Sequence, residues 1–254
     1  MAPLESGTDL GQRGFQMFGL LHSHRLVFHS CREVGGGVAS FAFTPEQPFE
    51  AKAGQHGILQ LGGTARKPFS LASAPEEGSV LIGTSLLSGS SFKQRLAALQ
   101  PGDTVTFRGP VNKFTLDGAA PQVVMLAQGV GITPLRSMLA HAALSGMTIE
   151  SSLIHVAHAG HAYRAETEQW ATTAAYPQHA GDFRAAAADA ARTNPDATFF
   201  IAGATSFVSS AASLLREAGV TGANIRQDKY LGYKPAARQE VAGHHSQVRA
   251  ATAP

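Results

Sequence analysis

The sequence predicts two domains: an antiparallel β-barrel followed by an α/β domain with a doubly wound parallel sheet. The 254 residues are enough for two domains of ordinary size. In the first half, short apolar runs recur about every ten residues with Gly and Pro between them, which is typical of small antiparallel barrels. In the second half, apolar runs alternate with helical patterns, which is typical of a parallel sheet covered by helices.

Six short apolar runs predict the strands of the barrel. They are residues 25–30, 38–43, 57–61, 68–72, 80–85 and 104–108. A helix is expected at residues 91–99, because Ser90 or Ser91 can cap its start and a Pro-Gly-Asp turn follows it. We place this domain at residues 16–118 and expect a loose polar tail at residues 1–15.

From residue 121 onward the sequence alternates between strand and helix patterns. Strands are expected at residues 123–127, 149–157 and 198–202, and helices at residues 135–144, 183–192 and 207–218. Gly146 and Gly219 follow the first and the last of these helices, where glycine commonly ends a helix. We place this domain at residues 119–234, and we expect the unpatterned residues 235–254 to form a second loose tail.

Composition argues against several classes of protein. The formal net charge of +2, without a long Lys/Arg run, favours neither a nucleic-acid partner nor a membrane partner. The single cysteine, Cys31, cannot form an internal disulfide, hold an iron–sulfur cluster or complete a cysteine zinc site. No stretch has the apolar length of a signal peptide or a membrane helix. We therefore expect a soluble cytoplasmic protein.

The segment from Gly129 to Pro134 is the most informative in the second half. It follows an apolar strand, and Gly129, Val130 and Gly131 form a Gly-x-Gly turn that lets the backbone approach a pyrophosphate. Thr133 is expected as the N-cap of the next helix and Pro134 as its first residue, so that free N–H groups face the anion. The alternative is an ordinary strand–turn–helix connection without a ligand.

The residues around the second strand of this domain bear on the choice of nucleotide. An acidic residue at the end of that strand would bind the ribose of NADH, but Glu150 stands before the strand. The later positions are His155, His158, His161 and Arg164. A neutral-to-basic pocket favours NADPH, although a solvated loop explains the histidines equally well. No Cys, Asp or Glu accompanies them at metal-ligand spacing, so no metal site is predicted.

A second group of motifs connects the two halves. Residues 66–73, Arg-Lys-Pro-Phe-Ser-Leu-Ala-Ser, resemble the flavin-binding signature Arg-x-(Tyr/Phe)-(Ser/Thr) of the ferredoxin–NADP reductase family. Further segments are similar to motifs of that family and occur in the same order. They are Gly54-Gln55-His56, Gly89-Ser90-Ser91, Pro101-Gly102-Asp103, Gly109-Pro110, the nicotinamide loop at 129–134 and Ile201-Ala202-Gly203-Ala204. The resemblance covers about residues 20–233.

The resemblance implies a flavoprotein oxidoreductase. It would take a hydride from NADPH or NADH onto bound FAD and pass electrons one at a time to a separate acceptor, such as a ferredoxin, a haem protein or an oxygenase component. FAD is favoured over FMN because the helix start at Gly89, Ser90 and Ser91 suits a pyrophosphate.

The resemblance also assigns roles to the flavin signature. Phe69 is expected to stack on the isoalloxazine ring, and Ser70 to form a hydrogen bond near the flavin N5, which receives the hydride. Lys67, with the adjacent Arg66 as a second cation, is expected to neutralise a flavin phosphate, and Pro68 belongs to the same signature. Without the resemblance, Phe69 would be read as an ordinary barrel-core aromatic.

The remaining roles concern the nicotinamide. Thr133 is expected beside it, and Gly203 is expected to let it approach the flavin, because hydride transfer needs donor and acceptor atoms about 3–3.5 Å apart. Tyr230 or Tyr233 is expected to cover the other face of the flavin, although a strand core residue is the simpler interpretation of each.

Two departures from the family pattern support a second hypothesis. Lys67 stands where the signature has Arg, and lysine cannot form the bidentate fork of arginine on a phosphate. Ala202 stands where the family has Cys. The alternative function is therefore a non-catalytic flavin- or nucleotide-binding module that regulates or relays electrons. A nucleotide-binding enzyme without flavin is a third hypothesis.

Overall fold

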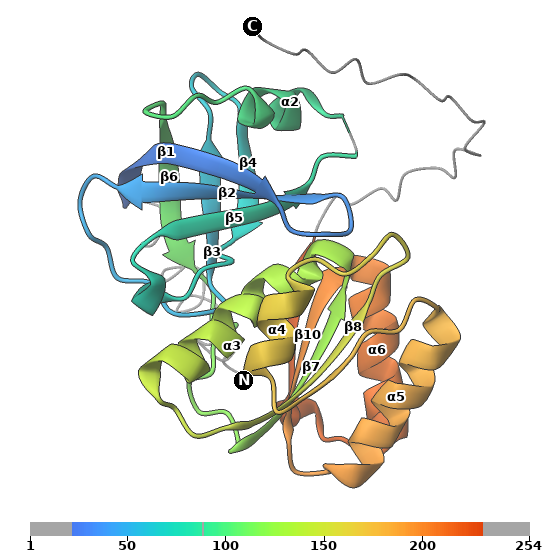
Figure 1. The fold of residues 1–254 in the computed structure, drawn as a ribbon. Helices are drawn as coiled ribbons and strands as arrows, with labels where there is room; N and C mark the ends of the chain where they lie inside the picture. Colours follow the sequence, from blue (N-terminus) through green and yellow to red (C-terminus); the bar gives the residue numbers. More distant parts are fainter. Residues whose placement is uncertain (1–21, 88, 231–254) are drawn as a thin grey trace, which may run out of the picture.

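The computed structural model describes residues 22–87 and 89–230, and Figure 1 shows two sheets placed one above the other. The predicted tails, residues 1–15 and 235–254, and Tyr233 lie outside the described residues. No helix in the described ranges has the length and hydropathy that crossing a bilayer requires.

The first domain is a six-stranded antiparallel sheet in the order β4-β3-β6-β1-β2-β5. Its strands are β1 (Ser23–Glu33), β2 (Val38–Pro45), β3 (His56–Gln60), β4 (Arg66–Ser70), β5 (Val80–Ser85) and β6 (Thr104–Val111). The sheet curls until its two edges meet, where Leu71 forms a bridge with Ile82. All six predicted strands are present, and the sheet has the curled form of a small barrel.

The inside of this domain is filled by side chains that alternate along the strands. β6 shows the period of two clearly, because every second residue from Val105 to Val111 is buried. Phe41, Phe43 and Phe107 are among the largest fully buried side chains. Helix α2 (Ser91–Ala97) adds Phe92 and Leu96 to the same core. It lies on the side of the barrel away from the second domain (Figure 1).

The second domain is a five-stranded parallel sheet in the order β11-β10-β7-β8-β9. The strands are β7 (Gln122–Gln128), β8 (Glu150–Val156), β9 (Thr173–Ala175), β10 (Thr198–Ala204) and β11 (Ile225–Tyr230). Helices α3 (Ile132–Ser145) and α4 (Arg164–Trp170) lie on the face toward the barrel, and α5 (Ala180–Thr193) and α6 (Thr205–Glu217) on the other (Figure 1). β7 and β10 are buried almost throughout because helices cover both faces.

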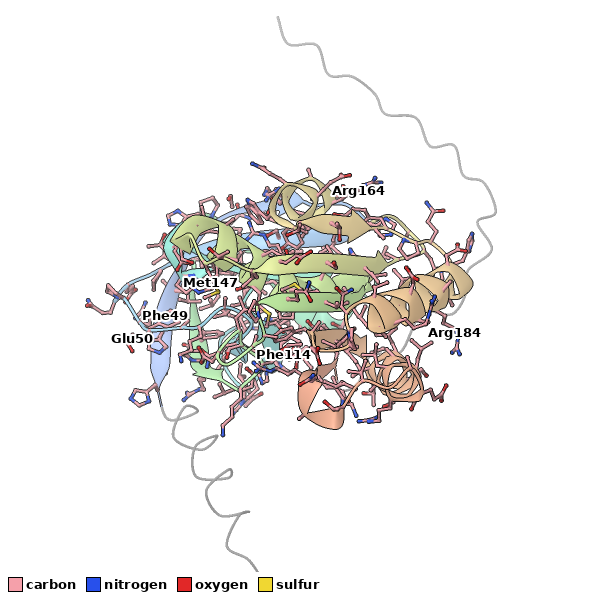
Figure 2. The ribbon with its side chains drawn as sticks, turned by 90° about the horizontal axis from the view of Figure 1, so that it is seen from below. Phe49, Glu50, Phe114, Met147, Arg164 and Arg184 are labelled. Atoms are coloured by element: carbon pink, nitrogen blue, oxygen red, sulfur yellow. The ribbon has the colours of Figure 1, made fainter. Side chains whose placement is uncertain are left out.

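Residues of both domains share one hydrophobic core. Val38 and Ala72 of the barrel belong to the same buried cluster as Met125 and Met138 of the α/β domain. Phe114, in the segment that joins the two sheets, lies in the middle of the molecule (Figure 2). Its ring packs edge-on against Phe200 with centroids 5.4 Å apart. The domains are therefore packed against each other rather than loosely tethered.

The predicted start of α3 is wrong by two residues. The N-cap is Gly131, and Thr133 lies inside the first turn, where its hydroxyl donates to the Val130 carbonyl at 3.1 Å. The reason is a 3₁₀ turn, η2 (Gly129–Gly131), which runs directly into α3. A threonine followed by proline predicts a cap, but continuous helical turns need none at that point.

Candidate functional site

Three of the predicted site residues, from three distant segments, meet at one point between the domains. Ser70 ends β4, Thr133 lies in the first turn of α3, and Tyr230 ends β11. The Tyr230 hydroxyl is 3.2 Å from Ser70 Oγ and 3.0 Å from Thr133 Oγ1. The flavin signature and the nucleotide loop therefore adjoin, as hydride transfer between two cofactors would require.

The topology explains why these segments meet. β7, β10 and β11 are parallel neighbours, so the loop after β7 and the last residues of β11 lie at the same edge of the sheet. Gly83 on β5 then lets the barrel come close to this edge. A Cβ at Gly83 would lie 2.6 Å from Thr133 Cγ2 and 2.6 Å from the Tyr163 hydroxyl. We did not predict this contact, although a glycine inside a strand is a known sign of close backbone approach.

We also did not predict that Asp228 and His56 lie beside Ser70. Ser70 Oγ donates to Asp228 Oδ2 at 3.3 Å, and His56 is the cross-strand partner of Ser70. Burial raises the pKa of Asp228, and His56 and the Ser70 hydroxyl oppose that rise. Burial lowers the pKa of His56, and Asp228 opposes that fall. The one available signal was an acidic residue in the last strand, whose partners the sequence does not show.

Asn112 determines which nitrogen of His56 carries the proton. Its side-chain amide nitrogen lies 2.8 Å from His56 Nδ1, and its oxygen accepts the N–H of Phe114 at 3.2 Å. Since the oxygen is already engaged, the NH₂ group faces the imidazole and donates to Nδ1. Neutral His56 therefore carries its proton on Nε2.

Two neighbouring lysines, Lys67 near the start of β4 and Lys93 on α2, lie close enough for their charges to interact. Lys67 Nζ donates to Ser90 Oγ at 3.2 Å and lies 5.8 Å from the centre of the Phe92 ring. Burial lowers the pKa of Lys93, and the charge of Lys67 lowers it further. Within the described residues no carboxylate forms an ion pair with either lysine. Two neighbouring cations without an anion form a suitable place for a phosphate.

The direction of each side chain along β4 separates Lys67 from Arg66. Successive residues of a strand point to opposite faces, so Lys67 and Phe69 share the face that carries Ser90 and Phe92. The Phe69 ring lies 5.7 Å from Phe92, and Arg66 and Pro68 are exposed on the other face. Lys67, rather than Arg66, is therefore the residue placed to meet a phosphate. α2 has only seven residues, so we assign its start, with Gly89 and Ser91, no separate anion site.

The glycines of the nucleotide loop have different surroundings. Gly129 has a φ of 53° and open space around the position of a Cβ. A Cβ at Gly131 would lie 2.2 Å from the Ala202 carbonyl oxygen, and one at Gly203 would lie 3.1 Å from Gln128 Cβ. Gly129 is therefore the glycine that faces open space, whereas Gly131 and Gly203 are needed for packing of the strand ends.

His155 supports the nucleotide loop through a hydrogen bond to its first glycine. It is fully buried, and its Nε2 donates to the Gly129 carbonyl at 2.9 Å. Burial lowers the pKa of His155 to about 4, so the ring is neutral. Its Nδ1 has no partner in the described part of the chain. The solvated-loop interpretation is therefore wrong for His155, whereas His158 is exposed.

No acidic residue lies in residues 157–165, the segment directly after β8, whose last residue is Val156. Arg164 stacks on Tyr176 with its guanidinium 4.7 Å from the ring centre and pairs with Glu168 at 3.5 Å. It lies at the rim of the molecule (Figure 2). Among the described residues, no group of three His, Cys, Asp or Glu side chains is placed to hold a metal ion.

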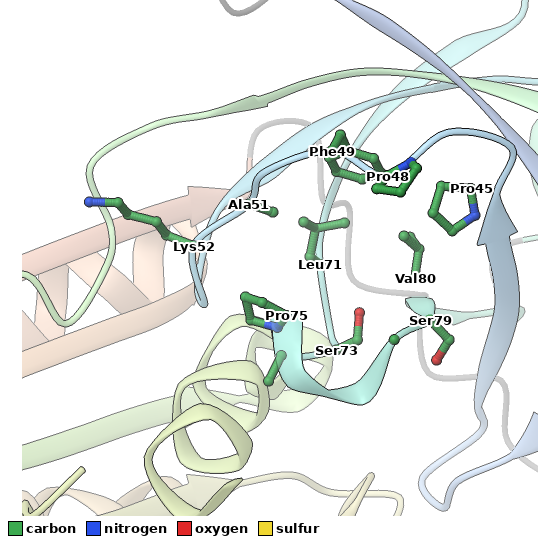
Figure 3. Close-up of a pocket in the computed structure, with 12 residues that line it drawn as sticks. Pro45, Pro48, Phe49, Ala51, Lys52, Leu71, Ser73, Pro75, Ser79 and Val80 are labelled. Atoms are coloured by element: carbon green, nitrogen blue, oxygen red, sulfur yellow. The ribbon is translucent and has the colours of Figure 1, made fainter. Parts of the chain in front are cut away.

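A hollow of about 180 Å³ lies elsewhere, in the wall of the barrel (Figure 3). Its lining is mainly apolar and proline-rich and includes Pro45, Pro48, Phe49 and Val80. It contains none of the predicted cofactor residues. The meeting point of Ser70, Thr133 and Tyr230, not this hollow, is therefore the candidate functional site.

Comparisons with known proteins agree with the geometry. No family model matches the chain. The curated ferredoxin–NADP reductase B of Sorangium cellulosum is 35% identical over 105 residues, 39% of this chain and 43% of that protein. The crystal structure of the cytochrome P450 reductase GcoB of Amycolatopsis matches with a TM-score of 0.69 and 18% identity, over 82% of this chain and 69% of that one. The FAD/NAD-binding domain of a nitric oxide dioxygenase from Vibrio cholerae matches with a TM-score of 0.66 and 19% identity, over 82% of this chain and 98% of that one.

The chain has the two-domain fold of these neighbours, in which an antiparallel barrel is joined to a parallel sheet covered by helices. The resemblance to the ferredoxin–NADP reductase family is confirmed, because the chain has that two-domain fold and shares sequence with reductases of this type. The chain spans less than half the length of the curated relatives it matches.

Proposed function

We propose that this chain is an NAD(P)H-dependent flavoprotein reductase that passes electrons from bound FAD to a separate redox acceptor. One observation carries the proposal: a single hydroxyl, that of Tyr230, lies within hydrogen-bond distance of both Ser70 and Thr133. The two segments that would hold the hydride acceptor and the hydride donor are thereby adjacent. Hydride transfer depends on such closeness, since the reacting atoms must come to about 3–3.5 Å.

The residues present fit a flavin dinucleotide. When bound, the flavin supplies the chemistry of accepting a hydride and releasing single electrons, which no side chain can perform. Lys67, Lys93 and Ser90 would bind its pyrophosphate, since the two lysines lack a carboxylate partner within the described residues. Phe69 would pack on the ring system, and Ser70 would bind its polar edge. The names of structural neighbours, a flavohemoglobin with bound FAD and an FAD/NAD-binding domain, favour FAD over FMN.

The nucleotide would bind at the loop after β7. Gly129 leaves open space where the backbone can approach a pyrophosphate, and His155 fixes its carbonyl. Val130 and Pro134 complete the turn. Because no acid that could bind the ribose of NADH lies in residues 157–165 after β8, we favour NADPH over NADH.

The Tyr230 hydroxyl lies at the point where the two cofactors would meet. It stands between Ser70 and Thr133, so it occupies the space through which the two cofactors would face each other. We propose that Tyr230 moves aside when the nicotinamide enters. The Ser70 and Thr133 hydroxyls donate to Asp228 and to Val130, so the single Tyr230 proton is donated to one of them at a time. Breaking that hydrogen bond costs about 0.5–1.5 kcal/mol, which binding of a dinucleotide can supply.

The acceptor would be a separate redox protein or component. The sequence has one cysteine, too few for an iron–sulfur cluster of its own. The names of the relatives, a ferredoxin–NADP reductase and a cytochrome P450 reductase, support acceptors of the ferredoxin or haem-protein class. The exposed, unpaired thiol of Cys31 suits a reducing compartment, so we place the protein in the cytoplasm.

A second candidate function is a non-catalytic flavin- or nucleotide-binding relay. It is favoured by Ala202, which is fully buried and offers no thiol, and by the Tyr230 hydroxyl at the meeting point. This candidate predicts bound flavin that neither NADPH nor NADH reduces.

Anaerobic stopped-flow spectroscopy tests the proposal. We expect purified protein to carry FAD and the flavin absorbance to bleach on mixing with NADPH, NADH or both. Bound flavin that bleaches with neither would favour the non-catalytic relay. Protein that stays colourless after incubation with FAD would favour a nucleotide-binding enzyme without flavin.

Two matched pairs of variants locate the two sites. Gly129→Asp should slow bleaching strongly while FAD stays bound, because it puts a negative charge beside the pyrophosphate. Gly129→Asn is its control, since it has the same size and tolerates the same positive φ. Replacing Lys67 and Lys93 by Ala should weaken FAD binding by about tenfold or more. Lys52→Ala should not, because Lys52 is exposed and pairs with Asp117, away from Lys67 and Ser90. Equal behaviour within either pair would contradict the placement of that cofactor.

A further inference from the structure

Four charged side chains form a chain that crosses the domain boundary twice. Arg32 on β1 pairs with Glu166 on α4 at 2.5 Å, and Glu166 pairs with Arg136 on α3 at 2.6 Å. Arg136 in turn pairs with Glu77 at 2.5 Å, in the 3₁₀ turn η1 (Pro75–Glu77) of the barrel domain. The first and last members belong to the barrel, and the two between them to the α/β domain.

Arg136 is the buried centre of this chain. Its side chain is 3% exposed, and its donors reach three segments. Nε donates to Glu166 at 2.7 Å, Nη2 to Glu77 Oε1 at 2.8 Å, and Nη1 to the Ala72 carbonyl at 2.8 Å. The guanidinium also lies 5.0 Å from the Trp170 ring centre and 5.5 Å from that of Tyr163.

Arg136 stays protonated in this environment. Burial lowers the pKa of Arg136, but the bonds and charges of Glu77 and Glu166 outweigh burial and raise it overall. Arg32 faces the same Glu166 carboxylate from β1. The network therefore holds two positive and two negative charges, and its centre stays ionised.

The contacts of Arg136 join α3, the helix after the nucleotide loop, to the segment that follows β4. Ala72 follows Ser70 by two residues, and Arg136 follows Thr133 by three. One residue further along each segment, Ser137 Oγ donates to the Ser73 carbonyl at 2.6 Å. On the barrel side, Glu77 also accepts the N–H of Ala74 at 2.7 Å. This bond stabilises residues 72–77, the segment that Arg136 contacts.

We propose that Arg136 is a positioning residue that sets the distance between Ser70 and Thr133 by joining the first turns of α3 to residues 72–77. This inference rests on the proposed function, since the distance matters only if a hydride passes there. A planar fork with fixed donor directions is required, because one side chain must reach two carboxylates and a carbonyl at once.

Arg136→Met tests the proposal, with Arg32→Met as the matched control. We expect Arg136→Met to keep its FAD and its KM for the nucleotide within about threefold, and its rate of flavin bleaching to fall by about 10- to 100-fold, because small misplacements of reacting groups have effects of that size. Arg136→Lys should restore little of the rate, because it keeps the charge but loses the fork. Arg32→Met loses only an exposed ion pair and should stay near wild type.

Glu77→Ala gives a second approach if Arg136→Met does not fold. Glu77 is more exposed than Arg136, and its loss leaves Glu166 to pair the guanidinium. The same pattern, a reduced bleaching rate with KM and FAD content preserved, is expected. The readout besides activity is amide hydrogen exchange in residues 72–77 of the protein without nucleotide, which both variants should accelerate.

The outcomes separate the two proposals. Bleaching rates within twofold of wild type in a folded Arg136→Met or Glu77→Ala variant would overturn the positioning role, and so would unchanged exchange in residues 72–77. A wild-type protein whose flavin does not bleach would overturn the proposed function instead. Accelerated exchange in the variants would then still show that Arg136 holds the two segments together.

Discussion

His155 is a single residue whose burial changes its chemistry. An unperturbed imidazole is half-protonated near neutral pH, but this one lies behind Gly129 with no exposed surface. Its one bond keeps a proton on Nε2, and the unpartnered Nδ1 has no room for a second charge. The ring is therefore neutral at neutral pH and can hold the Gly129 carbonyl there.

The pH dependence of stability should report this burial. The pKa of His155 is about 4 in the folded protein and about 6.5 when unfolded. The unfolded chain therefore binds the proton first as pH falls. The free energy of unfolding should drop by about 3 kcal/mol from this residue between pH 7 and pH 4.

Urea unfolding at pH 7 and at pH 4 measures that drop. His155→Gln keeps a donor for the Gly129 carbonyl but does not titrate, so its stability should fall less with acid than that of the wild type. His158→Gln, at an exposed position, should behave as the wild type does. A His155→Gln protein with the wild-type slope would show that the buried imidazole does not set the acid sensitivity.

Tyr230→Phe tests the proposal that the Tyr230 hydroxyl moves aside when the nicotinamide enters. The variant loses both hydroxyl contacts, so unfolding should require about 1–3 kcal/mol less. Since a nicotinamide would no longer have to break these bonds, the KM for the nucleotide should fall several-fold. Tyr176→Phe is the control in steady-state assays, and an unchanged or higher KM in Tyr230→Phe would argue against displacement of the hydroxyl.

At the scale of elements, strands with clear alternation were predictable and short elements were not. β6 and β3 alternate between buried and more exposed residues because one face of each strand packs on a core. α4 has seven residues and β9 three, too few for any period to show. α4 also begins after Tyr163, whose φ of 57° is unusual for a bulky residue and gives no signal in the sequence.

The site was predictable where a motif is local and unpredictable where it depends on distant contacts. Ser70 and Thr133 each lie in a recognisable local motif, and the structure brings them together through Tyr230. His56 and Asp228 join the same place by pairing across 172 positions of sequence. Single-sequence patterns contain no information on such pairs, because register and domain docking bring them together.

The packing of β5 on α3 gives a prediction at this scale. Gly83→Ala would put a methyl group within 2.6 Å of Thr133 and Tyr163, so α3 must shift away from the barrel. We expect slower flavin bleaching, normal FAD content and a loss of stability of about 1–3 kcal/mol from overpacking.

Gly181→Ala is the matched control for Gly83→Ala. Gly181 lies in α5 with no atom within 4 Å of the Cβ position, so this variant should be neutral or slightly stabilised. Thermal unfolding and stopped-flow bleaching compare the two. Wild-type bleaching in Gly83→Ala would mean that the approach of β5 to α3 is not needed for hydride transfer.

The whole molecule behaves as one packed body because a single core cluster includes both sheets. Arg136 and Phe114 add polar and aromatic contacts across the same boundary. Two domains with a shared core of this kind should not melt separately. We expect one calorimetric transition for the full chain.

FAD should raise the temperature of that transition, because a ligand that binds only the folded state stabilises it. Since the two domains unfold together, the nucleotide-binding domain should gain as much as the barrel. Differential scanning calorimetry with and without added FAD measures this. Two resolved transitions, only one of which moves with FAD, would contradict the shared core.

Asn112 stands where the chain leaves β6 for the second domain, in a left-handed conformation with a φ of 84°. Its side chain donates to His56, which belongs to the polar group around Asp228 and Ser70. The covalent connection between the domains is thus also a hydrogen-bond neighbour of the imidazole. A swivel of one domain on the other that turned Asn112 would break its bond to His56 Nδ1, so the protonation of His56 would change with the movement.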